Sequence, residues 1–203
     1  MVNVKNKCDY FQSDAGVESY DFPYDVKFRK LSCFFVVDNN GQVSVVGRNN
    51  CDALNNTALI NAVKCGDARL FVSWMGRRRT DLFQITDLKH FLEENPKIFV
   101  LSDVGTYDGK VNDCFQVKDE DNCSVFPYNV KSHSLSCFVV VTNDGQVAQI
   151  GRSNCEGERN RSLVYDVMKG EARLFVAWAG QYRTDFFQIR NIEKFMRENS
   201  HFL

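Results

Sequence analysis

The sequence has no segment that is apolar enough to span a bilayer, and it has almost no net charge. None of its apolar runs approaches the roughly 18–20 residues that a membrane-spanning helix needs. The formal net charge of -1 gives no overall attraction to nucleic acid or to anionic membranes. We therefore expect no membrane span and no nucleic-acid partner. Residues 1–7 contain no hydrophobic signal region, which predicts either a cytosolic protein or one whose signal peptide has been removed.

Motifs for a specific reaction, metal or cofactor are also missing. The three histidines, His90, His133 and His201, have no zinc-ligand spacing with the cysteines. The sequence contains neither a Gly-rich phosphate loop after a strand nor a Gly-x-Ser-x-Gly nucleophile motif. We therefore expect no metal and no cofactor, and we favour a protein that is not an enzyme.

What the sequence does contain is one unit written twice. A shift of 104 positions aligns Phe22-Pro23-Tyr24 with Phe126-Pro127-Tyr128 and Trp74 with Trp178, without a gap. Residues 11–99 and 115–203 share about 41 identities in 89 positions. A period of this size is that of a small complete domain and is too long for a solenoid repeat. The sequence therefore predicts repeat domain 1 at residues 1–99, a packed linker at 100–110 and repeat domain 2 at 111–203.

Local patterns predict the same elements in each copy. Residues 31–46 and 135–150 read as β-hairpins with Asn-Gly or Asp-Gly in a type I′ turn. The apolar run 31–37 indicates a central strand that is buried on both faces. A helix capped by Asn56 or Thr57, and by Ser162 in the second copy, is expected to end at Gly66 and Gly170.

A second hairpin and a final helix complete each copy. Strands are expected at 68–74 and 81–85, and a helix capped by Asp87 or Asn191 follows. A further strand is expected near Phe11 and Phe115. The fold class is therefore α+β: two tandem homologous domains, each an antiparallel sheet in the order β-ββ-α-ββ-α with two packed helices.

The eight cysteines allow disulfides, and they are more than a cytosolic protein usually carries. Cys8–Cys51 and Cys114–Cys155 are the matching pairs that we expect, with buried thiols as the alternative. For the remaining equivalent pair, Cys33 and Cys137, which lies within apolar strands, buried thiols are the preferred interpretation.

The compartment follows mainly from these cysteines. Three glycosylation sequons, at Asn55, Asn122 and Asn160, are about as many as chance would produce, so they add little. We expect an extracellular protein, with a cytoplasmic one as the alternative.

Polar residues that both copies keep are the candidates for function, because apolar residues kept in both are explained by a core. The densest set is a Trp-x-Gly-x-x-Arg-Thr-Asp segment across the second hairpin turn of each copy, where loops commonly carry recognition. A Trp face beside Arg, Thr and Asp could stack on a sugar or aromatic ligand and bond its polar edge. The alternative is a core Trp with a local Arg–Asp ion pair. The candidate ligand-binding residues of this set are Trp74, Arg79, Thr80, Asp81, Trp178, Arg183, Thr184 and Asp185.

A second set precedes the first helix of each copy, where backbone N–H groups favour anions. It reads Gly-Arg-x-Asn-Cys in both copies, and its candidate residues are Arg48, Asn50, Arg152 and Asn154. The alternative is that the arginines bond loop carbonyls. Arg69 and Arg173 are expected to be charges on the sheet surface.

These observations favour a secreted, internally duplicated binding protein that recognises a carbohydrate, a small polar ligand or a protein through the Trp/Arg/Thr/Asp turn of each copy. Two linked weak sites could bind a multivalent target far more tightly than one. The alternatives are an enzyme with an active site in the cleft between the repeats, and a structural or self-associating protein with no ligand site.

Overall fold

The computed structural model describes residues 32–47, 53–75, 80–96, 118–119, 136–151, 156–179, 184–200 and 203. For several strand residues in these ranges, only the backbone is described. The first copy contributes four strands and two helices: β1 (Ser32–Asp38), β2 (Val43–Val45), α1 (Ala53–Cys65), β3 (Ala68–Met75), β4 (Thr80–Ile85) and α2 (Leu88–Glu94). The second copy contributes β5 (Lys118–Asp119), β6 (Ser136–Thr142), β7 (Val147–Gln149), α3 (Gly157–Met168), β8 (Ala172–Ala179), β9 (Thr184–Ile189) and α4 (Ile192–Glu198).

Each copy is an α+β unit built on an antiparallel sheet. The strand orders are β2-β1-β3-β4 and β5-β9-β8-β6-β7, so the four equivalent strands pair in the same way in both sheets. The short strand β5 differs because it pairs in parallel with β9, with Lys118 opposite Phe187. The strands expected near Phe11 and Phe115, and the linker at 100–110, lie outside the described residues, so those details stay predictions.

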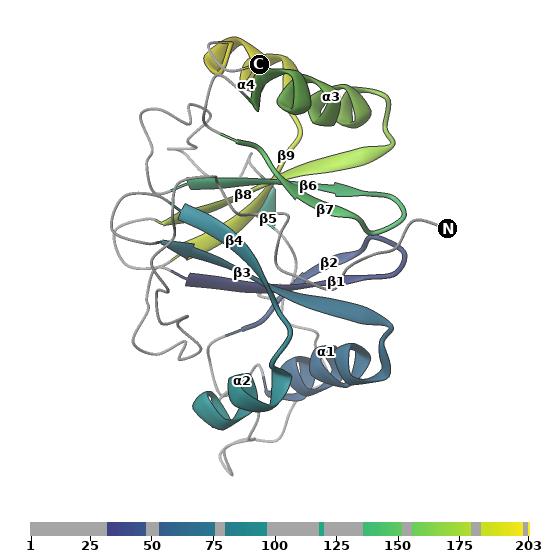
Figure 1. The fold of residues 1–203 in the computed structure, drawn as a ribbon, viewed down its shortest axis with the longest axis vertical. Coiled ribbons are helices and arrows are strands. Elements are labelled where there is room, and N and C mark those ends of the chain that lie inside the picture. Colours follow the sequence, from purple (N-terminus) through teal and green to yellow (C-terminus); the bar gives the residue numbers. More distant parts are fainter. Residues whose placement is uncertain are drawn as a thin grey trace.

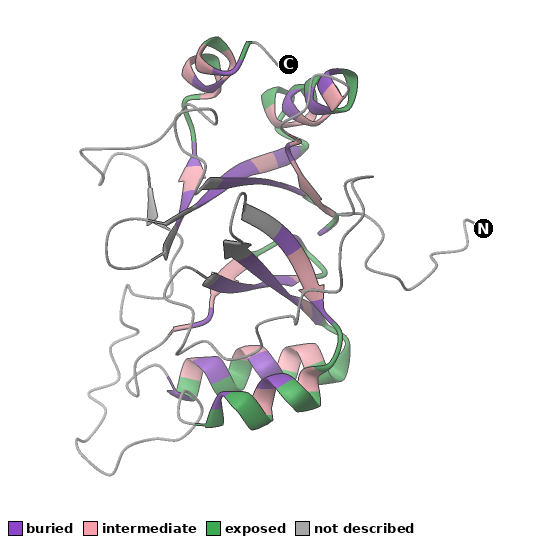
Figure 2. Cartoon of the chain, turned by 60° about the vertical axis from the view of Figure 1, so that its left-hand side comes forward, coloured by how far each residue is buried: buried purple, intermediate pink, exposed green. Residues whose placement is uncertain are grey.

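The two copies pack with their sheets face to face. Figure 1 shows four layers: the helices of the first copy, its sheet, the sheet of the second copy, and α3 with α4. Strands alternate their side chains between two faces, so each sheet buries one face under its own helices and the other against its partner sheet. In Figure 2 the strands are mainly buried, whereas exposed residues follow the outer sides of the helices.

Three apolar cores correspond to the three gaps between the layers. The two outer cores join each sheet to its own helices, as Phe34 and Phe91 do with ring centroids 5.1 Å apart. The middle core takes residues from both copies: Cys33, Phe35, Val37, Phe71, Leu82, Cys137, Val139, Val141, Phe175, Ala177 and Phe186. Phe35 of β1 stacks on Phe186 of β9 at 4.6 Å, so the copies share one core.

The shared core explains why residues 33–37 are apolar throughout. Residues 33–37 of β1 are all buried, because Phe34 and Val36 face the helices while Phe35 and Val37 face the other sheet. The predicted central strand is therefore confirmed. Cys33 and Cys137 are buried thiols, as expected.

The hairpin turn differs from the predicted type I′ turn. Type I′ requires positive φ at two successive residues. Gly41 (φ 75°) and Gly145 (φ 80°) have positive φ, whereas no described non-glycine residue does. The N–H of Gly41 instead donates to the carbonyl of Asp38 at 3.0 Å, which is typical of a type I turn followed by a left-handed glycine. The carboxylate of Asp38 favours this turn by accepting the N–H groups of Asn40 and Gln42.

The helix starts also correct the prediction. α1 begins at Ala53 and α3 at Gly157, so Asn56, Thr57 and Ser162 lie inside helices and are not N-caps. The side chain of Asn56 is occupied by the backbone of Gly47, as described below. The caps of the short final helices are confirmed: Asp87 accepts the N–H of His90 at 3.0 Å, and Asn191 accepts that of Lys194 at 2.9 Å.

Candidate functional site

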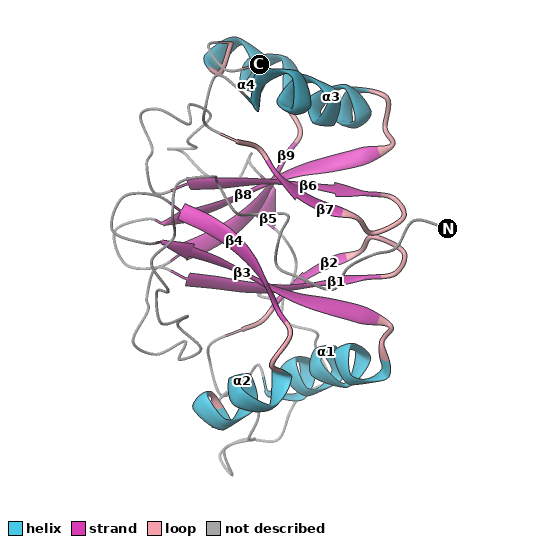
Figure 3. Ribbon diagram, viewed as in Figure 1, coloured by secondary structure: helices cyan, strands magenta, loops and turns pink. Residues whose placement is uncertain are grey.

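The two Trp-Gly-Arg-Thr-Asp turns emerge from the same end of the molecule. In the first sheet Ser32 pairs with Trp74 and Asp38 with Ala68, so the β3–β4 turn and the β1–β2 turn lie at opposite ends. The second sheet has the same register. The β1–β2 and β6–β7 turns contact each other across the copies, because a Cβ built on Gly145 would lie 3.6 Å from the backbone nitrogen of Gly41. The ends of β3 and β8 therefore share the other side of the sandwich, on the left in Figure 3.

Within each of these hairpins, the backbone brings Trp and Asp opposite one another. Trp74 pairs with Asp81, and Trp178 pairs with Asp185. The next pair outward is Met75 with Thr80, and Ala179 with Thr184 in the second copy. The structure describes the backbone of these residues but not the side chains of the six candidates, Trp74, Thr80, Asp81, Trp178, Thr184 and Asp185. Arg79 and Arg183 lie outside the described residues.

The second candidate set follows a glycine that is fixed to a helix. Asn56 of α1 is fully buried, and its amide accepts the N–H of Gly47 and donates to the carbonyl of Gly47, both at 2.9 Å. Asn160 does the same to Gly151 at 2.9 and 3.0 Å. These bonds fix where the chain leaves the first hairpin. The candidates themselves, Arg48, Asn50, Arg152 and Asn154, lie outside the described residues.

Several other polar residues that both copies keep have a visible role in the fold. Asn95 and Asn199 are buried and donate to the carbonyls of Phe91 and Phe195 at 2.8 and 2.7 Å, which satisfies the ends of α2 and α4. These asparagines, like Asn56 and Asn160, stabilise the fold. A polar residue kept in both copies is therefore not by itself a sign of function in this chain.

Arg69 and Arg173 do not lie on the sheet surface as predicted, because their strand face is the one that packs on the other copy. Arg69 donates to the carbonyl of Gly145, and Arg173 donates to the carbonyl of Gly41. Their guanidinium carbons lie 5.6 and 5.7 Å from the ring centroids of Phe71 and Phe175. The two arginines therefore join the copies.

The two arginines differ in the charge of the turn that each one contacts. Burial lowers the pKa of the Arg69 guanidinium, and the nearby carboxylate of Asp144 opposes this change. The hydrogen bond from the hydroxyl of Thr142 is the main cause that holds the pKa of Asp144 below its ordinary value. The first copy has Asn40 where the second has Asp144. The Nε of Arg173 is buried without a hydrogen-bond partner within the described part of the chain.

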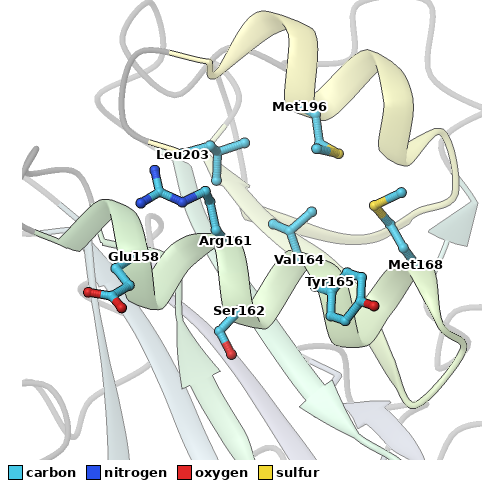
Figure 4. Close-up of a pocket in the computed structure, with 8 residues that line it drawn as sticks. All are labelled: Glu158, Arg161, Ser162, Val164, Tyr165, Met168, Met196 and Leu203. Carbon is cyan, nitrogen blue, oxygen red and sulfur yellow. The ribbon is translucent and has the colours of Figure 1, made fainter.

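A pocket of about 440 Å³ lies on the outer helical layer of the second copy, between α3 and α4 (Figure 4). Its lining is mainly apolar. The lining residues are Glu158, Arg161, Ser162, Val164, Tyr165, Met168, Met196 and Leu203. The residues that both copies share do not predict this pocket. The signal lay in a difference: Tyr165 and Met168 align with Asn61 and Lys64.

The described residues contain no group of three or more His, Cys, Asp or Glu side chains arranged to hold a metal ion. No helix among them has the length and apolar character needed to cross a membrane. Comparison of the chain with protein-family models, with curated proteins and with solved structures gives no match.

Proposed function

We propose that this chain is a non-enzymatic, secreted binding protein that recognises a carbohydrate, a small polar ligand or a protein through the Trp/Arg/Thr/Asp turn of each copy. The observation that carries the proposal is that both turns leave the same end of one packed body. Two equivalent turns on one side could contact neighbouring groups of a single multivalent target.

The roles of the other shared polar residues support this choice. Asn56, Asn95, Arg69 and their equivalents each satisfy backbone groups within the fold. That leaves the Trp-Gly-Arg-Thr-Asp turns as the densest set of shared polar residues to test, and their candidate side chains lie outside the described ones. The middle core also affects the main alternative: apolar side chains fill the space between the sheets, so an active site between the copies would have to lie outside that core.

Binding should be tested on the full chain, because neither half is expected to be stable alone. Burial of one large apolar side chain contributes about 1.5–3 kcal/mol. Exposing only a few members of the middle core would therefore offset the roughly 5–15 kcal/mol of a domain's net stability. A glycan and small-molecule screen of the intact chain comes first, followed by Arg79→Ala, Arg183→Ala and the double variant.

We expect each single variant to lose the avidity for a multivalent ligand, by about a hundredfold, and the double variant to lose binding. Arg197→Ala is the matched control, because Arg197 is an exposed arginine on α4. If the double variant binds as the control does, the turns are not the site. If the turn variants instead melt several degrees lower, the arginines serve the fold.

The extracellular location rests on the expected Cys8–Cys51 and Cys114–Cys155 pairs. Under denaturing conditions without reductant, two disulfides would leave four of the eight cysteines open to alkylation. Alkylation of all eight in protein purified under oxidising conditions would instead favour the cytoplasmic alternative.

A further inference from the structure

The pocket on the outer layer of the second copy has the size and lining of a small-molecule site. Its volume of about 440 Å³ lies within the roughly 300–1,000 Å³ that is typical of ligand pockets. Val164 closes the inner side and is buried, whereas Tyr165 and Met168 are each 57% exposed. Figure 4 shows the side chains of Met168 and Met196 on facing sides of the gap between α3 and α4. Methionine side chains are flexible and adapt to irregular apolar ligands.

The first copy shows that this apolar surface is not required by the fold. At the positions of Tyr165 and Met168, α1 has Asn61 and Lys64, which are polar. The buried residue next to this surface is apolar in both helices: it is Ile60 in α1 and Val164 in α3. Large exposed apolar side chains next to a pocket are typical of binding sites. The second copy therefore has a feature that its own core does not explain.

The charged residues that line the pocket indicate what kind of ligand fits. Arg161 replaces Thr57 of the first copy, and it makes no ion pair or hydrogen bond with the rest of the described chain. Glu158 lies in the first turn of α3, where a carboxylate is favoured by the helix dipole. Arg161 is exposed and lines the pocket one helical turn further on. Nearby, the ammonium group of Lys169 lies 4.4 Å from the ring centroid of Tyr165 and adds a second positive charge.

We propose that this pocket binds a small amphipathic carboxylate, with its apolar body between α3 and α4 and its carboxylate against the guanidinium of Arg161. The site is separate from the two turns, since it lies on the outer face of the helical layer of one copy. It therefore holds or fails independently of the proposed function.

The test is a titration of the full chain with decanoate and, as the uncharged comparison, decan-1-ol. NMR signals of the Met168 and Met196 methyl groups report binding at the pocket. We expect saturable shifts of both signals with decanoate. Arg161→Thr, which copies the first repeat, should weaken the binding of decanoate about fivefold and leave the binding of decanol unchanged. The double variant Tyr165→Asn with Met168→Lys should weaken the binding of both ligands. The methyl signal of Met196 still reports binding in this variant.

These positions are exposed, so the variants should keep the urea midpoint of the wild type, which is the check on folding. Leu54→Glu is the matched control: it changes an exposed apolar residue of α1, at the position equivalent to Glu158, and should not alter binding. The proposal is overturned if decanoate shifts neither methionine signal, or if Arg161→Thr weakens decanol as much as decanoate. It is also overturned if sedimentation shows a dimer that the double variant abolishes, because a second copy of the chain would then cover this face.

Discussion

Replacement of Gly41 by alanine tests how closely the two copies approach each other. Gly41 has a φ of 75°, and a Cβ built on it would lie 2.5 Å from the carbonyl oxygen of Thr142 in the other copy. Gly66 has nearly the same φ, 82°, but a Cβ there would have no neighbour within 4 Å. Both alanine variants incur the cost of a left-handed conformation, about 1–2 kcal/mol. Only Gly41→Ala also forces a backbone of the opposite sheet to move.

Forced overpacking of this kind costs typically about 1–3 kcal/mol. Gly41→Ala should therefore lower the free energy of unfolding by about 1–3 kcal/mol more than Gly66→Ala. Urea denaturation measures this as a lower midpoint at an unchanged slope. Gly145→Ala should behave like Gly41→Ala, because its Cβ would lie 2.8 Å from the carbonyl oxygen of Asp38. Equal losses for Gly41→Ala and Gly66→Ala would refute the close packing of the two hairpin turns.

Three further predictions follow from single contacts. Asn56→Ala should lower the free energy of unfolding by about 2–4 kcal/mol, since it leaves the N–H and carbonyl of Gly47 without their partner. Urea denaturation measures this loss, and Asn55→Ala, next to it on α1, should change the free energy of unfolding little. Asn160 should carry no glycan when the chain is expressed through a secretory pathway, because its amide is buried and bonded to Gly151; peptide mapping that finds a glycan there would contradict the fold of α3. The pKa of Asp144 is lower in the folded state than its ordinary value of 3.8. Its contribution to stability is therefore present above pH 3.8 and is lost as the pH falls through the folded-state pKa. Asp144→Asn, which copies Asn40, should therefore lose less stability than the wild type between about pH 5 and pH 2 in acid-denaturation curves.

The local elements were predictable because they depend on nearby residues. Gly66 and Gly170 end their helices at positive φ, and Asp87 and Asn191 cap the next ones, as sequence rules indicate. The start of α1 was mispredicted for a nonlocal reason. Asn56 resembles an N-cap, but its side chain bonds Gly47, nine positions away.

The docking of the two copies could not be predicted from periodicity. The apolar run in β1 indicates burial on both faces but does not say what covers the second face. The contact of Phe35 with Phe186 depends on two positions that differ between the copies, since their equivalents are Val139 and Leu82. Arg69 was misassigned to the surface for the same reason, because its partner is the turn of the other copy.

The candidate turns were found by comparing the copies, and the same comparison also selected Asn95 and Asn199, which are structural. A polar residue that both copies share is therefore needed either for the fold or for binding. Only the contacts seen in the structure distinguish these two roles. The pocket shows the converse, because its distinctive residues, Tyr165 and Met168, are those that the copies do not share.

The most direct test of the shared core is an NMR measurement of proximity between the ring protons of Phe35 and Phe186. Their ring centroids are 4.6 Å apart, and those of Phe35 and Phe71, within one sheet, are 5.5 Å apart. We predict nuclear Overhauser cross-peaks for both pairs in the full chain. Cross-peaks for Phe35 with Phe71 but none for Phe35 with Phe186 would contradict the face-to-face packing that brings the two turns to one end of the protein.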